Sequence, residues 1–156
     1  MASVQLIEIE LISPNQALYA TLLQFRIVIE VLDDLEKDLE VHVVWVGSFT
    51  SSSFDQLLDE LLISPLRVGI YDFVWPVPAP QLELIPQEDI LGVTLLFVSL
   101  RYRDQEFLRA GFFVDVDFIT EAHQLNPPQA VRVEHITRRV ETSPHITTKR
   151  IFWETE

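Results

Sequence analysis

The stretch GVTLLFVSLRYRDQEFLRAGFFVD, residues 92–115, decides the fold class of this chain. Apolar residues fill it on both sides of a short polar segment around Arg103, which predicts two antiparallel strands joined by a turn. We expect these strands at Val93–Tyr102 and Glu106–Val116. One charged residue, Arg109, interrupts the second apolar run, which raises the question of what its surface contacts.

The length of the turn fixes which residues of the hairpin face one another. A loop of three or five residues centred on Arg103 is a common choice. It would place Phe97 opposite Arg109, Leu95 opposite Gly111 and Val93 opposite Phe113. Odd-numbered residues, Phe107 included, would then share one face. A loop of two residues would break this register.

Both faces of the predicted hairpin are apolar, although a strand in a two-layer sandwich needs only one apolar face. The surplus face around Arg109 is either a binding patch or a surface that other parts of the chain cover. The residue pattern leaves both possibilities open.

Period-two alternation continues on either side of the hairpin. It predicts further strands at Ile7–Leu11, Phe25–Val31, Val41–Val46, Val68–Trp75, Val131–Val140 and His145–Trp153. The apolar spacing of Phe54–Ile63 also fits a helix, but in this β-rich chain we favour a strand with an irregular start. The prolines of WPVPAP, residues 75–80, indicate a loop or a sheet edge, because proline cannot donate to a strand ladder.

Two short helical segments are expected within the loops. Pro86 stands at a plausible first-turn position of the segment Ile85–Leu91, and Thr120 is a capping candidate for Thr120–Leu125. The pattern as a whole predicts an all-β antiparallel sandwich with short helices in its loops. The length of 156 residues suits one domain over residues 1–156.

Charge is distributed unevenly along the chain, whose net charge is −13. Residues 1–100 carry 15 acidic and 3 basic residues, a balance of −12, and the remainder carries 9 acidic and 8 basic residues. This acidic field disfavours direct nucleic-acid binding and would attract a basic partner. No run of residues is long and apolar enough to span a bilayer, so we expect no membrane insertion. The first ten residues lack the pattern of a secretory signal.

Composition and spacing speak against catalysis and against a resident cofactor or metal. Cysteine is absent, and His42, His123, His135 and His145 are isolated in the sequence, without a metal-ligand spacing. No nucleophile-elbow, phosphate-loop or dinucleotide motif is present. The acidic segment DDLEKDLE, residues 33–40, lacks the calcium-loop pattern. It is either a solvated loop or a docking site for a basic peptide.

Short motifs along the whole chain resemble those of the anti-silencing-function family of histone chaperones. The matching stretches are QF (24–25), DL (34–35), DLE (38–40), VGS (46–48), DQ-LD (55–59), LIP (84–86), GVT (92–94), YR-QEF-R-G (102–111), NPP (126–128) and Trp153. The resemblance implies an immunoglobulin-like sandwich that has no catalysis and no cofactor. It also implies a monomer that binds one histone H3–H4 heterodimer for nucleosome assembly or disassembly. A nuclear location is implied by the resemblance alone.

The resemblance assigns residues to three contact regions. A concave face for histone H3 would comprise Asp55, Asp89, Val93, Leu95, Arg109 and Phe113. An edge that receives an H4 strand would comprise His145, Ile146 and Thr147. A groove for peptides of chromatin-assembly factors would comprise Ile29, Asp38, Leu61 and Ile63.

Several positions depart from the family pattern. Leu95 is larger than the usual valine, Phe113 lacks the hydroxyl of the usual tyrosine, and His145 replaces a common arginine. The loop SFTSSSF, residues 48–54, is less acidic than usual. Lys37 replaces one acid of the peptide groove, so we expect that site to be weakened. The alternative function is a non-enzymatic sandwich scaffold or interaction module whose histone-binding surface has been rewritten or lost.

Overall fold

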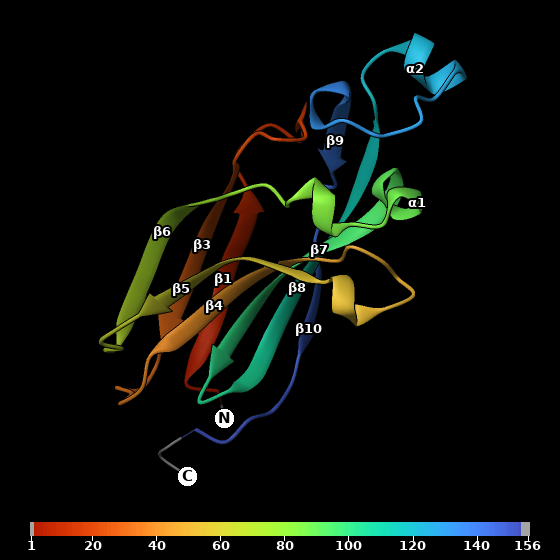
Figure 1. Ribbon diagram of the computed structural model, residues 1–156. Helices are drawn as coiled ribbons and strands as arrows, with labels where there is room; N and C mark the ends of the chain where they lie inside the picture. Colours follow the sequence, from red (N-terminus) through yellow and green to blue (C-terminus); the bar gives the residue numbers. More distant parts are fainter. Residues whose placement is uncertain (1, 154–156) are drawn as a thin grey trace.

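The computed structural model describes residues 2–153 of the chain as two packed β-sheets (Figure 1). The first sheet has the order β1-β3-β6, and the second has the order β2-β9-β8-β7-β4-β5, with β10 also paired to β8. The strands are β1 (Val4–Leu11), β2 (Gln16–Leu18), β3 (Leu23–Val31), β4 (Leu39–Trp45), β5 (Gln56–Ile63), β6 (Gly69–Val77), β7 (Gly92–Tyr102), β8 (Gln105–Phe118), β9 (Ile136–Val140) and β10 (His145–Thr148). Within residues 2–153, the neighbouring strands of both sheets pair antiparallel. The predicted antiparallel sandwich is therefore confirmed.

Short helical turns lie in the connections between strands. They are η1 (Ser52–Phe54), η2 (Leu82–Leu84), α1 (Gln87–Ile90), α2 (Glu121–Leu125) and η3 (Val133–His135). Both predicted helical segments are confirmed, and the Thr120 side chain accepts a hydrogen bond from the backbone N–H of His123, as an N-cap does. The region after Phe54 is a strand preceded by the irregular turn η1, as expected.

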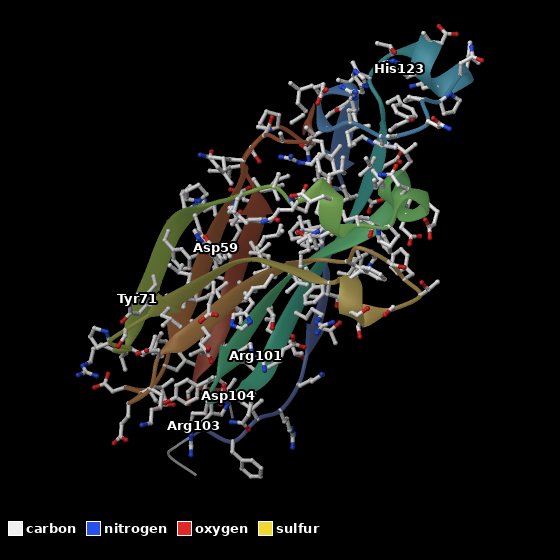
Figure 2. All side chains as sticks on the ribbon, in the orientation of Figure 1. Asp59, Tyr71, Arg101, Arg103, Asp104 and His123 are labelled. Atoms are coloured by element: carbon white, nitrogen blue, oxygen red, sulfur yellow. The ribbon has the colours of Figure 1, made fainter. Side chains whose placement is uncertain are left out.

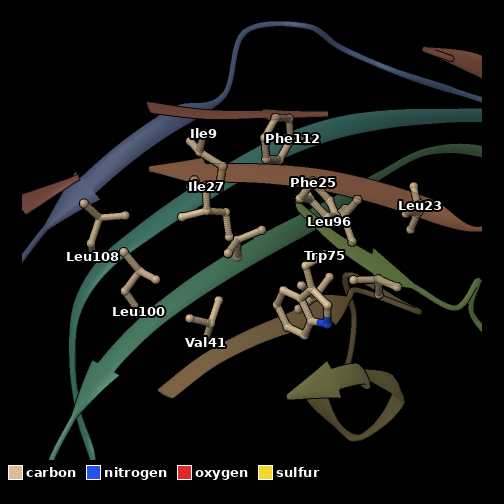
Figure 3. Close-up of a cluster of buried hydrophobic side chains, with 14 of the residues drawn as sticks. Ile9, Leu23, Phe25, Ile27, Val41, Trp75, Leu96, Leu100, Leu108 and Phe112 are labelled. Atoms are coloured by element: carbon tan, nitrogen blue, oxygen red, sulfur yellow. The ribbon is translucent and has the colours of Figure 1, made fainter. Parts of the chain in front are cut away.

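The core lies between the two sheets, where alternate residues of each strand meet. In β4 the side chains of Leu39, Val41, Val43 and Trp45 are buried, while the residues between them point outward. Phe25 of β3 packs against Phe112 of β8, with ring centroids 5.7 Å apart (Figure 3). Even-numbered residues of β7, and of β8 from Leu108 onward, thus face the core, and the odd-numbered residues between them face outward.

The turn of this hairpin differs from the prediction. Only Arg103 and Asp104 connect the strands, with φ angles of 52° and 62°, a conformation typical of a two-residue type I′ turn. The observed pairs are Leu95 with Phe113, Phe97 with Gly111 and Ser99 with Arg109, so the predicted pairs were wrong by two residues. A register shift after Leu100, a β-bulge, then puts odd-numbered residues of β7 opposite odd-numbered residues of β8, as predicted, although the two-residue loop alone would have paired odd with even.

The same irregularity moves Phe107 off the outer face on which it was predicted. Its ring contacts Trp153 at 5.0 Å, and Trp153 in turn stacks on Tyr102. Glu106 takes the place on the outer face, where it meets Ser99 and Arg109. The β-bulge therefore exchanges an aromatic residue for a carboxylate beside Arg109.

Two predicted strands are shorter than expected. Within Val131–Val140, the turn η3 occupies the first part and the strand begins at Ile136. Within His145–Trp153, the strand β10 ends at Thr148, one further backbone hydrogen bond joins Lys149 to Phe107, and Trp153 packs into the core. The three-residue strand β2 was not predicted because it is too short to show a period. Pro76 does lie in a strand, β6, but at the edge of its sheet, where a missing N–H is tolerated.

Candidate functional site

The outward face of the second sheet forms a continuous platform across five strands. Residues directly opposite one another on neighbouring strands share a face, so each cross-strand row can be read from the pairing. One apolar row runs from β5 to β10 through Leu57, Val44, Phe97, Gly111 and His145. Leu57 is 54% exposed in this row. Large contiguous apolar patches are rare on the surface of monomeric proteins and often mark interaction sites.

Arg109 lies on this platform and is held by two neighbours. Its guanidinium carbon is 4.0 Å from the centroid of the Phe97 ring, a cation–π contact. Its Nε and Nη2 atoms donate to Oε2 of Glu106 at 3.2 and 3.1 Å. The Arg109 side chain is still 44% exposed, so it is positioned without being covered.

Glu106 is the carboxylate that braces Arg109, and its own side chain is only 10% exposed. It accepts a hydrogen bond from the Ser99 hydroxyl at 2.5 Å. Burial alone would raise the pKa of Glu106, but the hydrogen bonds from Ser99 and Arg109 and the charges of Arg109 and Lys149 outweigh it. The pKa of Glu106 therefore lies below its ordinary value. The carboxylate remains ionised and fixes the direction of the guanidinium.

Apolar side chains lie on the same face as Arg109, on the side away from the hairpin turn. Leu95 pairs directly with Phe113, and Val93 follows on the same side of β7. Val93 is 60% exposed and Phe113 is 39% exposed, whereas Leu95 is half-buried. The face is thus only partly covered by the chain, which answers the question that the sequence left open.

Gly111 makes room for the larger Leu95. A β-carbon added at Gly111 would lie 3.3 Å from Cδ1 of Leu95, a tight contact. Beyond it, the Phe113 ring meets the His145 ring edge-on, with centroids 5.4 Å apart. The two departures at Leu95 and His145 are therefore packed against other residues of the platform.

The two predicted acidic residues flank the platform at different places. Asp55 follows η1 and is exposed. Burial raises the pKa of Asp55, and the positive charge of Arg109 partly offsets this effect. Asp55 is therefore close enough to Arg109 for the two charges to interact. Asp89 lies in the short helix α1, directly before β7, and is half-buried. Of the six predicted residues, four share the sheet face, and Asp55 and Asp89 lie on the segments that lead into it.

The three predicted edge residues lie on β10, which pairs with β8. His145 lies opposite Gly111 and Thr147 opposite Arg109, so both belong to the platform side of the strand. Ile146 is 47% exposed and lines a groove of about 1280 Å³ that separates β10 and the following segment from β1. Both β1 and β10 are edge strands here, which leaves backbone groups open to pairing.

The four residues predicted for the peptide groove do not come together. Leu61 and Ile63 line a hollow between β5 and β6. Ile29 is fully buried in the core and does not reach that surface. Asp38 lines a separate hollow, together with Lys37 and Arg103.

Sequence reasoning missed two polar residues that shape the platform, Ser99 and Glu106. Ser99 pairs with Arg109 and is buried beneath Glu106. The prediction that odd-numbered residues of the hairpin share one face already put Ser99 on the same face as Arg109. Nothing comparable was available for Glu106, because its direction depends on the bulge. Among the described residues no helix is long and apolar enough to cross a membrane.

Comparison with known proteins adds a family to this geometry. The family described as ASF1 like histone chaperone matches residues 1–154. The chain belongs to this family. The resemblance read from the short motifs is therefore confirmed.

Individual relatives match along the whole chain. Histone chaperone ASF1 of Yarrowia lipolytica is 37% identical over 157 residues, which cover 100% of this chain and 59% of the relative. Histone chaperone ASF1 of Candida albicans is also 37% identical, with 63% of the relative covered. A Caenorhabditis elegans protein named probable histone chaperone asf-1-like protein is 37% identical over 158 residues, with 64% covered. The chain thus spans about three fifths of the length of these relatives.

Proposed function

We propose that residues 1–156 form a single, non-enzymatic histone chaperone domain that binds one histone H3–H4 heterodimer for nucleosome assembly or disassembly. The relatives are named histone chaperones, and the platform offers an apolar surface beside a fixed cation. The observation that carries the proposal is the exposure of Val93 and Phe113 on the platform beside Arg109, which Glu106 and Phe97 hold in place.

The chemistry of the platform suits the apolar helical surface that an H3–H4 dimer would otherwise bury in a tetramer. Val93, Leu95 and Phe113 would cover apolar histone side chains, at roughly 25 cal/mol per Å² of buried area. Arg109 would meet a carboxylate or a carbonyl group of the histone. Asp55 and Asp89 would pair with histone lysine or arginine, which favours association rate and register more than affinity.

The edge of β10 supplies a second contact in this proposal. A segment of histone H4 would add as a strand beside His145, Ile146 and Thr147, with backbone hydrogen bonds giving most of the affinity. The groove beside Ile146, lined by apolar residues such as Leu6 and Phe107, could then receive an apolar side chain of that strand. The exposure of all four β10 residues supports this role.

Peptides of chromatin-assembly factors would bind the hollow between β5 and β6 weakly. Leu61 and Ile63 line this hollow, whereas Asp38 lies in a separate hollow beside Lys37, whose positive charge would repel a basic peptide. Nuclear location and a monomeric state belong to the same proposal. A scaffold with a lost histone-binding surface is the competing function.

Titration of purified H3–H4 into this protein tests the proposal. We expect saturable binding with one heterodimer per chain at about 50 mM salt, and weaker binding at about 300 mM salt because exposed charges are screened. Arg109→Glu should weaken binding by at least tenfold, since it puts a second carboxylate against Glu106 on the contact face.

A matched variant separates this effect from the loss of one positive charge. Arg67→Glu changes net charge equally in an exposed loop between β5 and β6, and it should bind as the unmodified protein does. Thermal unfolding checks that Arg109→Glu is folded. Absence of binding at low salt would overturn the chaperone proposal, and equal binding by both variants would overturn the assignment of the face.

A further inference from the structure

Three potential metal ligands come together on the same outward face, at the β4–β5 end of the cross-strand row that continues through Ser99 to Arg109. Glu40 and His42 are two residues apart on β4, and both point away from the core because the residues between and around them are buried. Glu60 lies directly opposite His42 on β5. The pairing of two strands therefore places one imidazole and two carboxylates side by side.

The distances within this cluster fit a shared cation better than hydrogen bonds. Nε2 of His42 lies 3.8 Å from Oε1 of Glu40 and 3.6 Å from Oε2 of Glu60. Hydrogen bonds between nitrogen and oxygen usually span about 2.7–3.2 Å. Ligand atoms held at about 2.0–2.2 Å from a tetrahedral zinc ion lie roughly 3.4 Å apart, which is close to both observed separations.

The ring nitrogen of His42 points into this cluster without a partner. Nε2 is buried from solvent and forms no hydrogen bond within residues 2–153. A buried, unpaired ring nitrogen costs free energy unless something occupies it. The two carboxylates beside it are acceptors, so a cation between the three groups would satisfy all of them.

Nearby positive side chains do not neutralise the two carboxylates. Arg101 lies opposite Glu40 on β7, but its Nη2 donates to the carbonyl oxygen of Asp104 at 3.3 Å. Figure 2 shows Arg101 beside the turn that holds Asp104. Lys37 and Arg103 line the same hollow as Glu40 and Glu60. In the described part of the chain, neither Glu40 nor Glu60 forms a salt bridge with these cations.

We propose that Glu40, His42 and Glu60 bind a divalent transition metal of the zinc type, with water as a fourth ligand. Zinc sites with three protein ligands of this kind and one open position are common. Calcium is disfavoured, because it takes six to eight oxygen ligands and this cluster supplies one nitrogen. Sequence spacing did not indicate the site, since Glu60 comes from the neighbouring strand. The inference does not depend on histone binding.

Titration of tag-free protein with Zn²⁺ and with Co²⁺ tests the site. We expect one zinc ion per chain by calorimetry and a rise in the thermal unfolding midpoint when zinc is added. Co²⁺ should give visible absorption typical of four-coordinate cobalt, which zinc displaces. His42→Gln and Glu60→Gln should each weaken zinc binding by at least tenfold while leaving the apo protein folded.

His135→Gln is the matched control. His123 and His135 lie together elsewhere, with ring centroids 4.6 Å apart and an unpaired Nδ1 on each ring, so they are a competing location for zinc. This control should bind zinc as the unmodified protein does. Failure to bind zinc up to about millimolar concentration, or loss of binding in His135→Gln but not in His42→Gln, would overturn the proposal.

Discussion

At the scale of single residues, Arg138 shows how a charge can be a structural element. Its side chain is 1% exposed, and its guanidinium donates to the backbone carbonyl oxygens of Leu18, Tyr19 and Leu22. Burial lowers the pKa of Arg138 to about 10, with the neighbouring Tyr19 acting in the opposite direction. Arg138 thus fastens the turn after β2 to β9.

We predict that Arg138→Met lowers the free energy of unfolding by about 2–4 kcal/mol, because it leaves buried carbonyl oxygens without donors. Arg139→Met is the matched control. The adjacent Arg139 is 68% exposed and has one loose ion pair with Asp115 at 3.7 Å, so its loss should cost under about 1 kcal/mol. Urea unfolding of both variants measures the difference, and equal costs would contradict the role assigned to Arg138.

How far the sequence predicted the candidate site also depends on individual residues. Alternation placed Val93, Leu95, Arg109 and Phe113 on one face, and the structure has them there. The direction of Ile29 could not be read, because an apolar residue in a strand fits the core and a groove equally well. Glu106 was missed because a bulge, which has no clear sequence signal here, turns it toward Arg109.

At the scale of elements, the β7–β8 hairpin carries both the fold and the platform. Its strands were predicted within a few residues, since long alternating runs are a strong signal. Its turn was not, because Arg103 and Asp104 lack the glycine that usually marks a two-residue turn. Predictions for short segments failed for a related reason. Three or four residues, as in β2 and β10, show too few alternations to define a strand end.

Glu106, which the bulge directs toward Arg109, should make the stability of the protein depend on pH. Because the folded-state pKa of Glu106 is below its ordinary value of 4.5, this carboxylate stabilises the fold above that pH. The contribution is lost as the pH falls through the lowered pKa, where the folded state also takes up the proton. The stability difference between the unmodified protein and Glu106→Gln should therefore be largest near neutral pH and shrink as the pH falls below 4.5.

Urea unfolding at several pH values measures this difference. Glu121→Gln removes a carboxylate from an exposed position in α2 and serves as the control for a change of one charge. The difference in the free energy of unfolding between Glu106→Gln and the unmodified protein should shrink on acidification. A difference that stays constant or grows would contradict the role of Glu106 in holding Arg109.

At the scale of the whole molecule, two sheets of unequal size divide the tasks. The three-stranded sheet covers the core, while the larger sheet presents the platform on its outer face (Figure 1). Most of the net charge of −13 belongs to the first 100 residues, so a basic partner would be attracted before it makes close contacts. Local alternation of apolar and polar residues was enough to predict the two sheets. It could not predict which outer sheet face remains exposed, because that depends on how distant parts of the chain pack.

Methyl NMR during titration with H3–H4 locates the contact surface directly. We expect the methyl signals of Val93, Leu95 and Ile146 to shift or broaden as one heterodimer binds each chain. The signals of Ile70 and Val74 should stay unchanged, since these residues are 66% and 53% exposed on the other sheet and report any non-specific association. Changes confined to Ile70 and Val74, or no changes at saturating histone, would contradict histone binding on the β7–β8 platform.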